Sequence, residues 1–220
     1  EAEEAPELAF QINRDAPRVM AKKARENNIA FIHFSTDYVF NGEKEGQYFE
    51  DDKTNPLGVY GKSKLAGELA IQEVGGQFYI FRTSSVYSNI GHNFYLIIKR
   101  MSQKLEELNV VADQRSIPTS NLFIARQMQK IIPQLNENNI GIYHLVPDGY
   151  CSWYTFAKTI IGITNPNFNS DNLHPIKAYE YKSKAKRPSN SCLDNQKIKQ
   201  AFMLKLQSWQ VELNMVINEA

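Results

Sequence analysis

Three short, continuous apolar runs, at residues 29–34, 78–82 and 141–146, constrain the fold of this chain more than any other feature. Each has the length of a strand, and a run without polar alternation is typical of a strand that is buried on both faces of a parallel sheet. Segments with helical spacing of apolar residues separate the runs. This alternation predicts an α/β fold built on a parallel sheet.

The helical segments are predicted from apolar spacing, caps and glycine stops. The first, at residues 6–28, is expected to bury Leu8, Ile12, Val19, Met20 and Ala24, with Pro17 distorting its middle. The others are expected at residues 60–74, 93–108, 122–132 and 152–161, with short helices after Asp194 and Ser208. Leu65, Leu69 and Val74 are assigned to the inner side of the second helix, and Leu105 to the core side of the third. A short strand is expected at residues 176–181.

Polar residues follow the first apolar run directly, as Ser35-Thr36-Asp37. Open α/β sheets place ligand sites just beyond the carboxyl ends of their parallel strands. The second run also ends in small polar residues, Thr83-Ser84-Ser85. These two strand ends are therefore the expected position of a binding site.

Tyr60 and Lys64 are four residues apart in Tyr60-Gly61-Lys62-Ser63-Lys64, so on a helix they share one face. An ammonium beside a phenol favours the phenolate and lowers the tyrosine pKa. Bringing that pKa from ~10 to ~7 takes about 4 kcal/mol, and a phenol so tuned exchanges protons with a carbonyl oxygen near neutral pH. The alternative is a surface turn that enters an amphipathic helix.

Other polar groups have both a structural and a functional interpretation. For His33, a buried structural role is favoured over a catalytic one. For Asn13, a position on the surface is favoured over a position in an active site. Glu50-Asp51-Asp52 indicates a solvated turn more than a metal site, since no regular set of further ligands accompanies it. The cluster Lys182, Lys184, Lys186 and Arg187 is equally consistent with a solvated loop and with a clamp on a phosphate group.

Composition narrows the class of protein. The 220 residues are 42% hydrophobic and 22% charged, and their net charge of +1 gives no bulk electrostatic reason to expect nucleic acid or a membrane surface as partner. The two cysteines suggest no disulfide framework or zinc site, which fits a cytoplasmic protein. No apolar run approaches the ~20 residues of a membrane span. The chain begins at Glu1 without methionine, so we expect a processed protein or part of a longer one.

Several motifs occur together in a fixed order. They are Ser35-Thr36-Asp37-Tyr38-Val39-Phe40, Tyr60-Gly61-Lys62-Ser63-Lys64, Arg82-Thr83-Ser84, Asn93-Phe94, Asp113-Gln114, Pro118-Thr119, Ser152-Trp153, Arg187-Pro188 and Leu193-Asp194. As an ordered set they resemble the dTDP-4-dehydrorhamnose reductases, which are extended short-chain dehydrogenases. The resemblance runs from about residue 1 to the C-terminus.

The resemblance implies catalytic roles for three residues. Tyr60 would protonate the 4-keto oxygen as hydride arrives from NADPH or NADH, and Lys64 would lower the Tyr60 pKa and hold the nicotinamide ribose. Thr36 would hydrogen-bond the keto oxygen. Ser35 would lie with Tyr60 and Lys64 at the cofactor, and the remaining candidates would lie near a dTDP-sugar substrate: Asp37, Tyr38, Asn93, Gln114, Thr119 and Arg187. No metal ligands are assigned; Mg²⁺ and a homodimer both stay open.

The implied fold is the C-terminal part of a Rossmann-like, doubly wound parallel sheet with about three strands, plus a smaller, mostly helical substrate lobe. Residues 1–90 and 121–147 would form the first part, and residues 91–120 and 148–220 the lobe. No glycine-rich phosphate-binding turn occurs in the sequence, so we expect the cofactor-binding half to be absent and the chain alone to bind cofactor poorly. The strand at residues 29–34 would then have an open edge.

Four positions depart from the pattern of the family, which has tryptophan at Ser85, glycine at Ser88 and Ser116, and usually arginine at Cys192. Ser85 leaves the exact sugar nucleotide open, and Ser116 is expected to restrict a backbone that glycine frees. Two other functions therefore stay in view. One is a non-catalytic regulatory homologue, such as the methionine adenosyltransferase beta subunit; the other is a different sugar-nucleotide reductase or epimerase.

Overall fold

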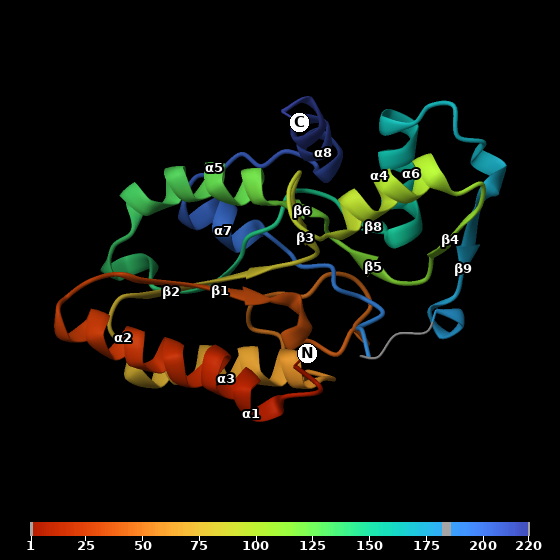
Figure 1. The fold of residues 1–220 in the computed structure, drawn as a ribbon. Coiled ribbons are helices and arrows are strands. Elements are labelled where there is room, and N and C mark those ends of the chain that lie inside the picture. Colours follow the sequence, from red (N-terminus) through yellow and green to blue (C-terminus); the bar gives the residue numbers. More distant parts are fainter. Residues whose placement is uncertain (1, 182–185, 220) are drawn as a thin grey trace.

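The computed structural model describes residues 2–181 and 186–219 (Figure 1). Its α-helices are α1 Pro6–Phe10, α2 Ala16–Glu26, α3 Val59–Val74, α4 Phe94–Lys104, α5 Asn121–Ile131, α6 Trp153–Thr164, α7 Gln196–Ala201 and α8 Trp209–Asn218. Its strands are β1 Phe31–Thr36, β2 Phe78–Thr83, β3 Val86–Tyr87, β4 Leu108–Val111, β5 Arg115–Ser116, β6 Thr119–Ser120, β7 Gly141–His144, β8 Cys151–Ser152 and β9 Leu173–Ile176.

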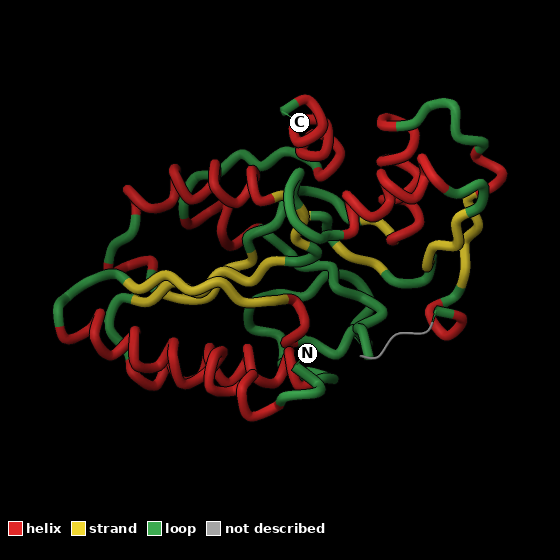
Figure 2. The backbone as a smooth tube through the Cα atoms, in the orientation of Figure 1, coloured by secondary structure: helices red, strands yellow, loops and turns green. Residues whose placement is uncertain are grey.

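The three apolar runs form one parallel sheet in the order β1-β2-β7, which confirms the predicted α/β class. Helices α1, α2 and α3 cover one face of this sheet, and α5 and α7 cover the other (Figures 1 and 2). Side chains alternate between the two faces, since Ile80 packs with Ile71 of α3 while Tyr79 and Phe81 pack with α5. Strand β1 is an edge strand of this sheet, and the Phe34 side chain on it is 41% exposed.

A second group of elements lies beyond the carboxyl ends of β1 and β2 (Figure 1). Helix α4 packs against α6, β4 pairs in parallel with β9, and α8 completes their shared core through Trp209 and Leu213. We propose the division of the chain that the sequence suggests, with one refinement. Ile198 and Phe202 pack in the core of the sheet, so the region around α7 belongs with the sheet.

Most local signals in the sequence are confirmed. Ser152 and Ser208 accept hydrogen bonds from the backbone N–H of Thr155 and Val211 and so cap α6 and α8. Asp194 accepts one from Gln196 N at the start of α7. Gly75 ends α3 with a φ of 72°, a conformation that favours glycine. The strand expected at residues 176–181 is wrong, because β9 ends at Ile176 and a 3-10 turn, Ala178–Glu180, follows it.

The first helix buries the opposite face from the one predicted. Leu8, Ile12, Val19 and Met20 are each more than half exposed. The buried positions are small or compact, among them Ala9, Pro17 and Ala21, and a π-helical turn, Gln11–Asp15, shifts the spacing just before Pro17. Leu69 and Leu105 are likewise exposed rather than buried as predicted. Apolar spacing alone therefore predicts the wrong buried face for the first helix.

Close approach to α3 explains the preference for small residues. A Cβ added at Gly67 of α3 would lie 2.0 Å from the Asn13 carbonyl oxygen of the π-helical turn. No real contact is that short, so the two helices pack at this distance only because residue 67 is glycine. The shape of the interface, rather than the number of apolar atoms, thus decides which face of the first helix is buried.

We expect Gly67→Ala to lower the free energy of unfolding by about 1–3 kcal/mol, since the methyl group would force two backbones apart. Urea denaturation followed by circular dichroism measures the change. Gly162→Ala in α6 is the matched control, because nothing lies within 4 Å of its added Cβ. That variant should gain about 0.5–1 kcal/mol from helix propensity. A Gly67→Ala protein as stable as Gly162→Ala would contradict the close approach.

Candidate active site

The N-terminal part of α3 lies against the carboxyl end of β1, as the family resemblance implies. Lys64 Nζ donates a hydrogen bond to the Phe34 carbonyl oxygen over 2.6 Å and lies 3.2 Å from His33 Nε2. Gly61 allows the approach, because a Cβ there would lie 2.2 Å from the Tyr38 carbonyl oxygen. The structure therefore brings the tyrosine–lysine pair to the end of the parallel strand.

The residues after β1 form a tight polar turn. Thr36 Oγ1 donates to Asp37 Oδ1 over 2.9 Å and accepts from the Tyr38 backbone N–H over 3.2 Å. The Tyr38 ring meets the Tyr60 ring edge to face, with centroids 5.9 Å apart. Thr36, Asp37, Tyr38, Tyr60 and Lys64 thus form one cluster.

The predicted lowering of the Tyr60 pKa by Lys64 is wrong for this structure. Partial burial raises the pKa of Tyr60; hydrogen bonding by Thr36 opposes that shift and the charge of Asp37 adds to it. Lys64 does not lower it, because the ammonium group is directed to β1 by its bonds to Phe34 and His33. The Tyr60 phenol therefore stays protonated through neutral pH.

His33 is a partner of Lys64 as well as a strand residue. It is half-buried and stacks on Phe31, with ring centroids 6.4 Å apart. Burial and the nearby Lys64 charge lower the pKa of His33 to about 4. Burial also lowers the pKa of Lys64, while Glu68 opposes that change. The imidazole is consequently neutral at pH 7, and its Nε2 can accept a hydrogen bond from the ammonium group.

Asn13 reaches the same helix turn from the π-helical segment. Its Nδ2 donates to Ser63 Oγ over 3.0 Å, and Ser63 Oγ donates to the Tyr60 carbonyl oxygen over 2.9 Å. Asn13 is therefore not a free surface residue, which corrects the structural interpretation of its sequence position. It connects the first helix to the turn that carries Tyr60.

Asp37 lies beneath the site rather than facing outward. Its side chain is 3% exposed and accepts from Ser84 Oγ over 3.1 Å in addition to Thr36. Burial raises the pKa of Asp37 to about 6, although these hydrogen bonds and one from Ser191 lower it. The neighbouring Ser35 hydroxyl is buried and has no hydrogen-bond partner among the described residues. Two polar groups at the strand end are thus held out of water.

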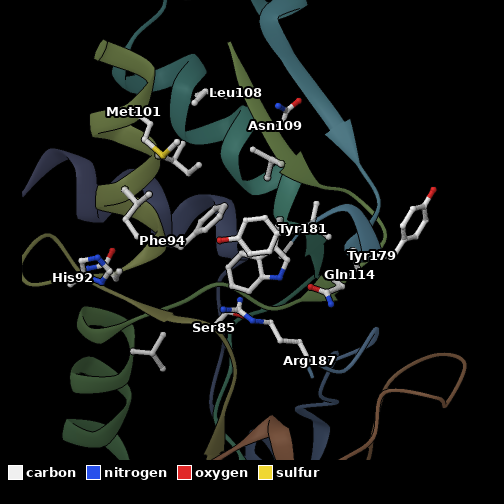
Figure 3. Close-up of a pocket in the computed structure, with 18 of the residues that line it drawn as sticks. Ser85, His92, Phe94, Met101, Leu108, Asn109, Gln114, Tyr179, Tyr181 and Arg187 are labelled. Atoms are coloured by element: carbon white, nitrogen blue, oxygen red, sulfur yellow. The ribbon is translucent and has the colours of Figure 1, made fainter. Parts of the chain in front are cut away.

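A cavity of about 790 Å³ opens in the second lobe next to this cluster (Figure 3). Aromatic side chains line it, including Phe94, Trp153 and Tyr181, and the Phe94 and Trp153 rings lie 4.6 Å apart. Cationic groups come from Lys186 and Arg187. Such a combination of apolar walls and a few polar groups is typical of a small-molecule site.

Three predicted substrate residues line this cavity, namely Asn93, Gln114 and Arg187. Asn93 also caps α4, since its Oδ1 accepts from Leu96 N. Thr119 does not reach the cavity: it is fully buried in β6 and donates to the Ile117 carbonyl oxygen. Lys186 lies on both the large cavity and a small hollow beside Tyr38 and Tyr60, so it connects the two regions. Lys182 and Lys184 lie outside the described residues.

Trp153 lines the cavity, which the apolar spacing of the helix predicted at residues 152–161 does not indicate, because that spacing is most simply explained by core positions for Trp153, Phe156 and Ile160. Phe156 and Ile160 are indeed buried, whereas Trp153 is only half-buried. The position just after the Ser152 cap was the available signal, because the first turn of a helix often faces a site at the strand ends. Tyr181 was missed as well, since it falls in the segment that was predicted as strand.

Two departures from the family pattern have structural outcomes. Ser85 lines the cavity with a left-handed backbone, φ 45°, which an L side chain rarely adopts. Ser116 lies in β5, pairs with Cys151 and has no positive φ, so the expected backbone restriction is wrong.

Both cysteines are free and buried, and burial raises the pKa of each thiol to about 12.

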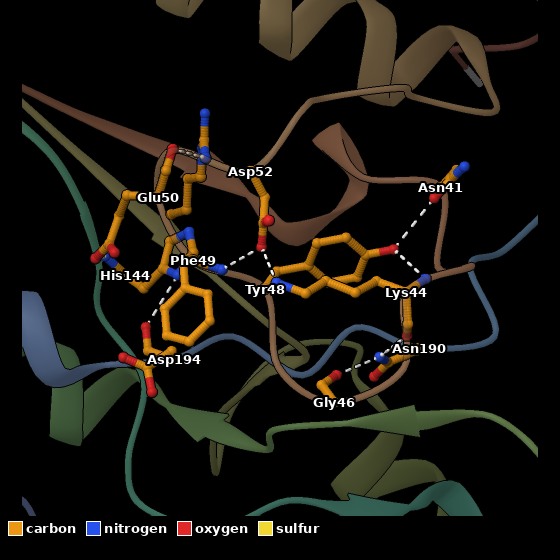
Figure 4. Close-up of polar contacts among 11 residues, drawn as sticks. Asn41, Lys44, Gly46, Tyr48, Phe49, Glu50, Asp52, His144, Asn190 and Asp194 are labelled. Carbon is orange, nitrogen blue, oxygen red and sulfur yellow. Dashed lines mark hydrogen bonds and ion pairs between the residues drawn. The ribbon is translucent and has the colours of Figure 1, made fainter.

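The acidic cluster is part of a hydrogen-bonded turn (Figure 4). Glu50 Oε1 accepts from His144 N over 2.9 Å, and Asp52 accepts from Phe49 N and pairs with Lys44. Asn190 holds the same loop through the Lys44 and Gly46 carbonyl oxygens. Within residues 2–181 and 186–219, no group of three His, Cys, Asp or Glu side chains is placed to hold a metal ion.

The residues at the end of β1 fit the ribose and nicotinamide end of a dinucleotide. Lys64 has three N–H donors, of which the backbone carbonyl of Phe34 and the ring of His33 occupy two. The orphaned Ser35 hydroxyl lies at the same strand end, and Tyr60 is 41% exposed beside it. One ammonium proton and two hydroxyl groups thus remain for a ligand.

The parallel sheet, with a tyrosine and a lysine one helical turn apart at its carboxyl edge, has the arrangement of the short-chain dehydrogenase class. Comparison with known proteins gives the family. The model of the RmlD substrate binding domain matches residues 1–220, and the chain belongs to this family.

Named relatives agree with this assignment. The chain is 39% identical to a dTDP-4-dehydrorhamnose reductase of Escherichia coli, with 99% of this chain and 75% of the relative covered. It is 38% identical to one of Sinorhizobium fredii, with 95% and 72% covered. A crystal structure of the Bacillus anthracis dTDP-4-dehydrorhamnose reductase in complex with NADP superimposes with a TM-score of 0.92 at 32% identity, covering 100% of this chain and 76% of that one.

No helix within the described ranges combines the length and the apolar character that crossing a membrane requires.

Proposed function

We propose that this chain carries the catalytic groups for reduction of the 4-keto group of dTDP-4-dehydro-L-rhamnose to dTDP-L-rhamnose with NADPH or NADH. The observation that carries the proposal is the placement of Tyr60 and Lys64 at the carboxyl end of β1, beside Thr36. The family assignment supports the choice of substrate.

Tyr60 acts as the general acid in this proposal. A nicotinamide cofactor, when bound, would supply hydride to C4 of the sugar, and the keto oxygen would need one proton to become a hydroxyl group. The raised pKa of Tyr60 keeps the phenol protonated at neutral pH, so this proton is available when the oxygen gains charge. The reaction consumes one hydride and one proton, and Tyr60 is reprotonated from water.

Lys64 and Thr36 hold the reacting groups. The two fixed partners of the Lys64 ammonium on β1 leave one N–H for the ribose of the cofactor. Thr36 accepts a hydrogen bond from Tyr38 N and lies close enough to Tyr60 to affect its pKa, which suits a hydrogen bond to the keto oxygen. The orphaned Ser35 hydroxyl is assigned to the cofactor side of the same strand end.

The large cavity is assigned to the sugar nucleotide. Asn93 and Gln114 offer amide groups, and Arg187 with Lys186 offers positive charge to the diphosphate. Tyr38 stays a candidate substrate contact beside Tyr60. Asp37 and Thr119 are buried, so we assign them to supporting these residues rather than to direct contact.

The proposal is tested by following NADPH oxidation in the presence of dTDP-4-dehydro-L-rhamnose, with the protein in its full natural length. We expect oxidation that depends on the sugar nucleotide and yields dTDP-L-rhamnose. Absence of turnover with this substrate, together with tight binding of a partner protein, would instead support a regulatory homologue. Turnover only with another 4-keto sugar nucleotide would show that the protein is a reductase of the proposed kind with a different substrate.

We further propose that the protein acts in the cytoplasm and forms a homodimer. The exposed side chains Leu8, Ile12, Val19 and Met20 support the second part, because they place apolar surface on one helical segment. Sedimentation velocity on the protein and on a Val19→Lys variant tests it. A monomer in both cases would exclude the homodimer.

A further inference from the structure

The hydroxyl group of Thr36 has one proton, which it donates in a hydrogen bond to Asp37. Thr36 Oγ1 donates to Asp37 Oδ1 over 2.9 Å, and the same oxygen accepts from Tyr38 N over 3.2 Å. A hydroxyl group is a single donor. While Asp37 is ionised and holds this proton in a hydrogen bond, Thr36 can accept a hydrogen bond from Tyr60 but has no proton left to donate to a keto oxygen.

Asp37 is surrounded by groups from four parts of the chain. Thr36 and Tyr38 flank it, Tyr60 faces it from α3, Ser84 comes from the end of β2, and Ser191 with Cys192 comes from the C-terminal segment. Burial opposes the charge of the carboxylate, whereas the hydroxyl hydrogen bonds favour it. Both protonation states of Asp37 are consequently accessible between pH 5 and 8.

Ser84 differs from Thr36 in having a second acceptor. Ser84 Oγ lies 3.1 Å from Asp37 Oδ2 and 3.2 Å from the Ser191 carbonyl oxygen, so its proton has two destinations inside the protein. The Thr36 proton is donated to Asp37 Oδ1, and the other group within its reach, the Tyr60 hydroxyl, belongs to the site. Protonation of Asp37 therefore turns the Thr36 hydroxyl proton toward the site, whereas the Ser84 hydroxyl can still donate to the Ser191 carbonyl oxygen.

We propose that Asp37 is a positioning residue that sets the direction of the Thr36 hydroxyl. Protonated Asp37 donates to Thr36 Oγ1, and Thr36 then donates its own proton into the site, whereas ionised Asp37 holds that proton back. One proton is taken up from solvent, and no covalent bond to carbon changes. The inference rests on the proposed function in one respect, since it assumes that the released proton serves the reduction of the keto group.

The kinetic test is the pH dependence of kcat/KM between pH 5 and 8.5, measured with NADPH and dTDP-4-dehydro-L-rhamnose on the full-length protein. With an Asp37 pKa of about 6, the wild type should gain roughly 50-fold from pH 8 to pH 6 if only the protonated form turns over. Asp37→Asn should show a flat profile over this range, because an amide nitrogen donates to Thr36 at every pH.

Ser84→Ala gives a second, independent arm. Removing one hydrogen bond to the ionised carboxylate should raise the Asp37 pKa and move the wild-type rise to higher pH. Thr36→Val should abolish the rise, and Thr36→Ser should restore it. An Asp37→Asn profile that keeps the wild-type rise, or a wild type that is flat through pH 6, would overturn the inference.

A measurement without turnover separates this inference from the proposed function. Carbon-13 NMR of labelled aspartate carboxyl groups gives the Asp37 pKa directly, with Asp37→Asn used only to assign the signal. Thr36→Val should raise this pKa, because the ionised form loses a donor. An unchanged pKa would overturn the inference even if the reductase is active. A raised pKa in a protein without reductase activity would support the hydrogen bond while rejecting the proposed reaction.

Discussion

Tyr60→Phe is expected to lower kcat for reduction of the 4-keto sugar nucleotide by about 10²–10⁴-fold, the usual effect of losing a general acid. The phenyl ring keeps the edge-to-face contact with Tyr38, so the site should keep its shape and KM should change little. Stopped-flow absorbance of NADPH consumption measures the step.

Tyr150→Phe is the control for this experiment. Tyr150 is 49% exposed and lies outside the cluster and both hollows, so its variant should retain wild-type rates. Equal rates in Tyr60→Phe and the wild type would remove Tyr60 from the mechanism. A parallel loss in Tyr150→Phe would show that the effect has a general cause unrelated to the site.

Glu68→Gln is expected to lower the free energy of unfolding by about 3–5 kcal/mol, because it leaves a buried guanidinium without its counter-charge. Glu68 is fully buried, and Arg82 Nη2 donates to its Oε2 over 2.7 Å. Arg82 also lies over the Phe40 ring, 5.1 Å from its centroid. This buried ion pair links α3, which carries Tyr60 and Lys64, to β2.

The matched control is Glu73→Gln on the same helix. Glu73 pairs with Arg18 over 3.3 Å at the surface, where the two side chains are 69% and 56% exposed. Such pairs contribute little, and we expect a change below about 0.5 kcal/mol. Chemical denaturation of both variants decides the comparison. Similar losses in the two would mean that burial of Glu68 has no energetic consequence.

The sheet and the tyrosine–lysine pair were predictable because their signals are local. A strand with an uninterrupted apolar run can bury all its side chains only in a sheet that is covered on both faces. Residues four apart on a helix share a face whatever surrounds them. Caps such as Ser152 and stops such as Gly75 also act on adjacent backbone. These features follow from the chain alone.

What the sequence could not indicate depends on three-dimensional neighbours. The burial of small residues on the first helix follows from the close contact of Gly67 with Asn13, which lies far away in sequence. Similarly, the direction of the Tyr60 pKa shift follows from where Lys64 is bound. The ammonium group bonds to Phe34 and His33, so proximity in sequence did not give an electrostatic effect on the phenol.

The most direct test of the catalytic account is transfer of deuterium from NADPH labelled at C4 of the nicotinamide. The full-length protein, incubated with dTDP-4-dehydro-L-rhamnose and this cofactor, should give dTDP-L-rhamnose with deuterium at sugar C4, as seen by NMR of the product. Transfer should be strongly slowed in Tyr60→Phe. Absence of deuterium at C4 in the wild-type product, or equal transfer rates in the two proteins, would contradict the account.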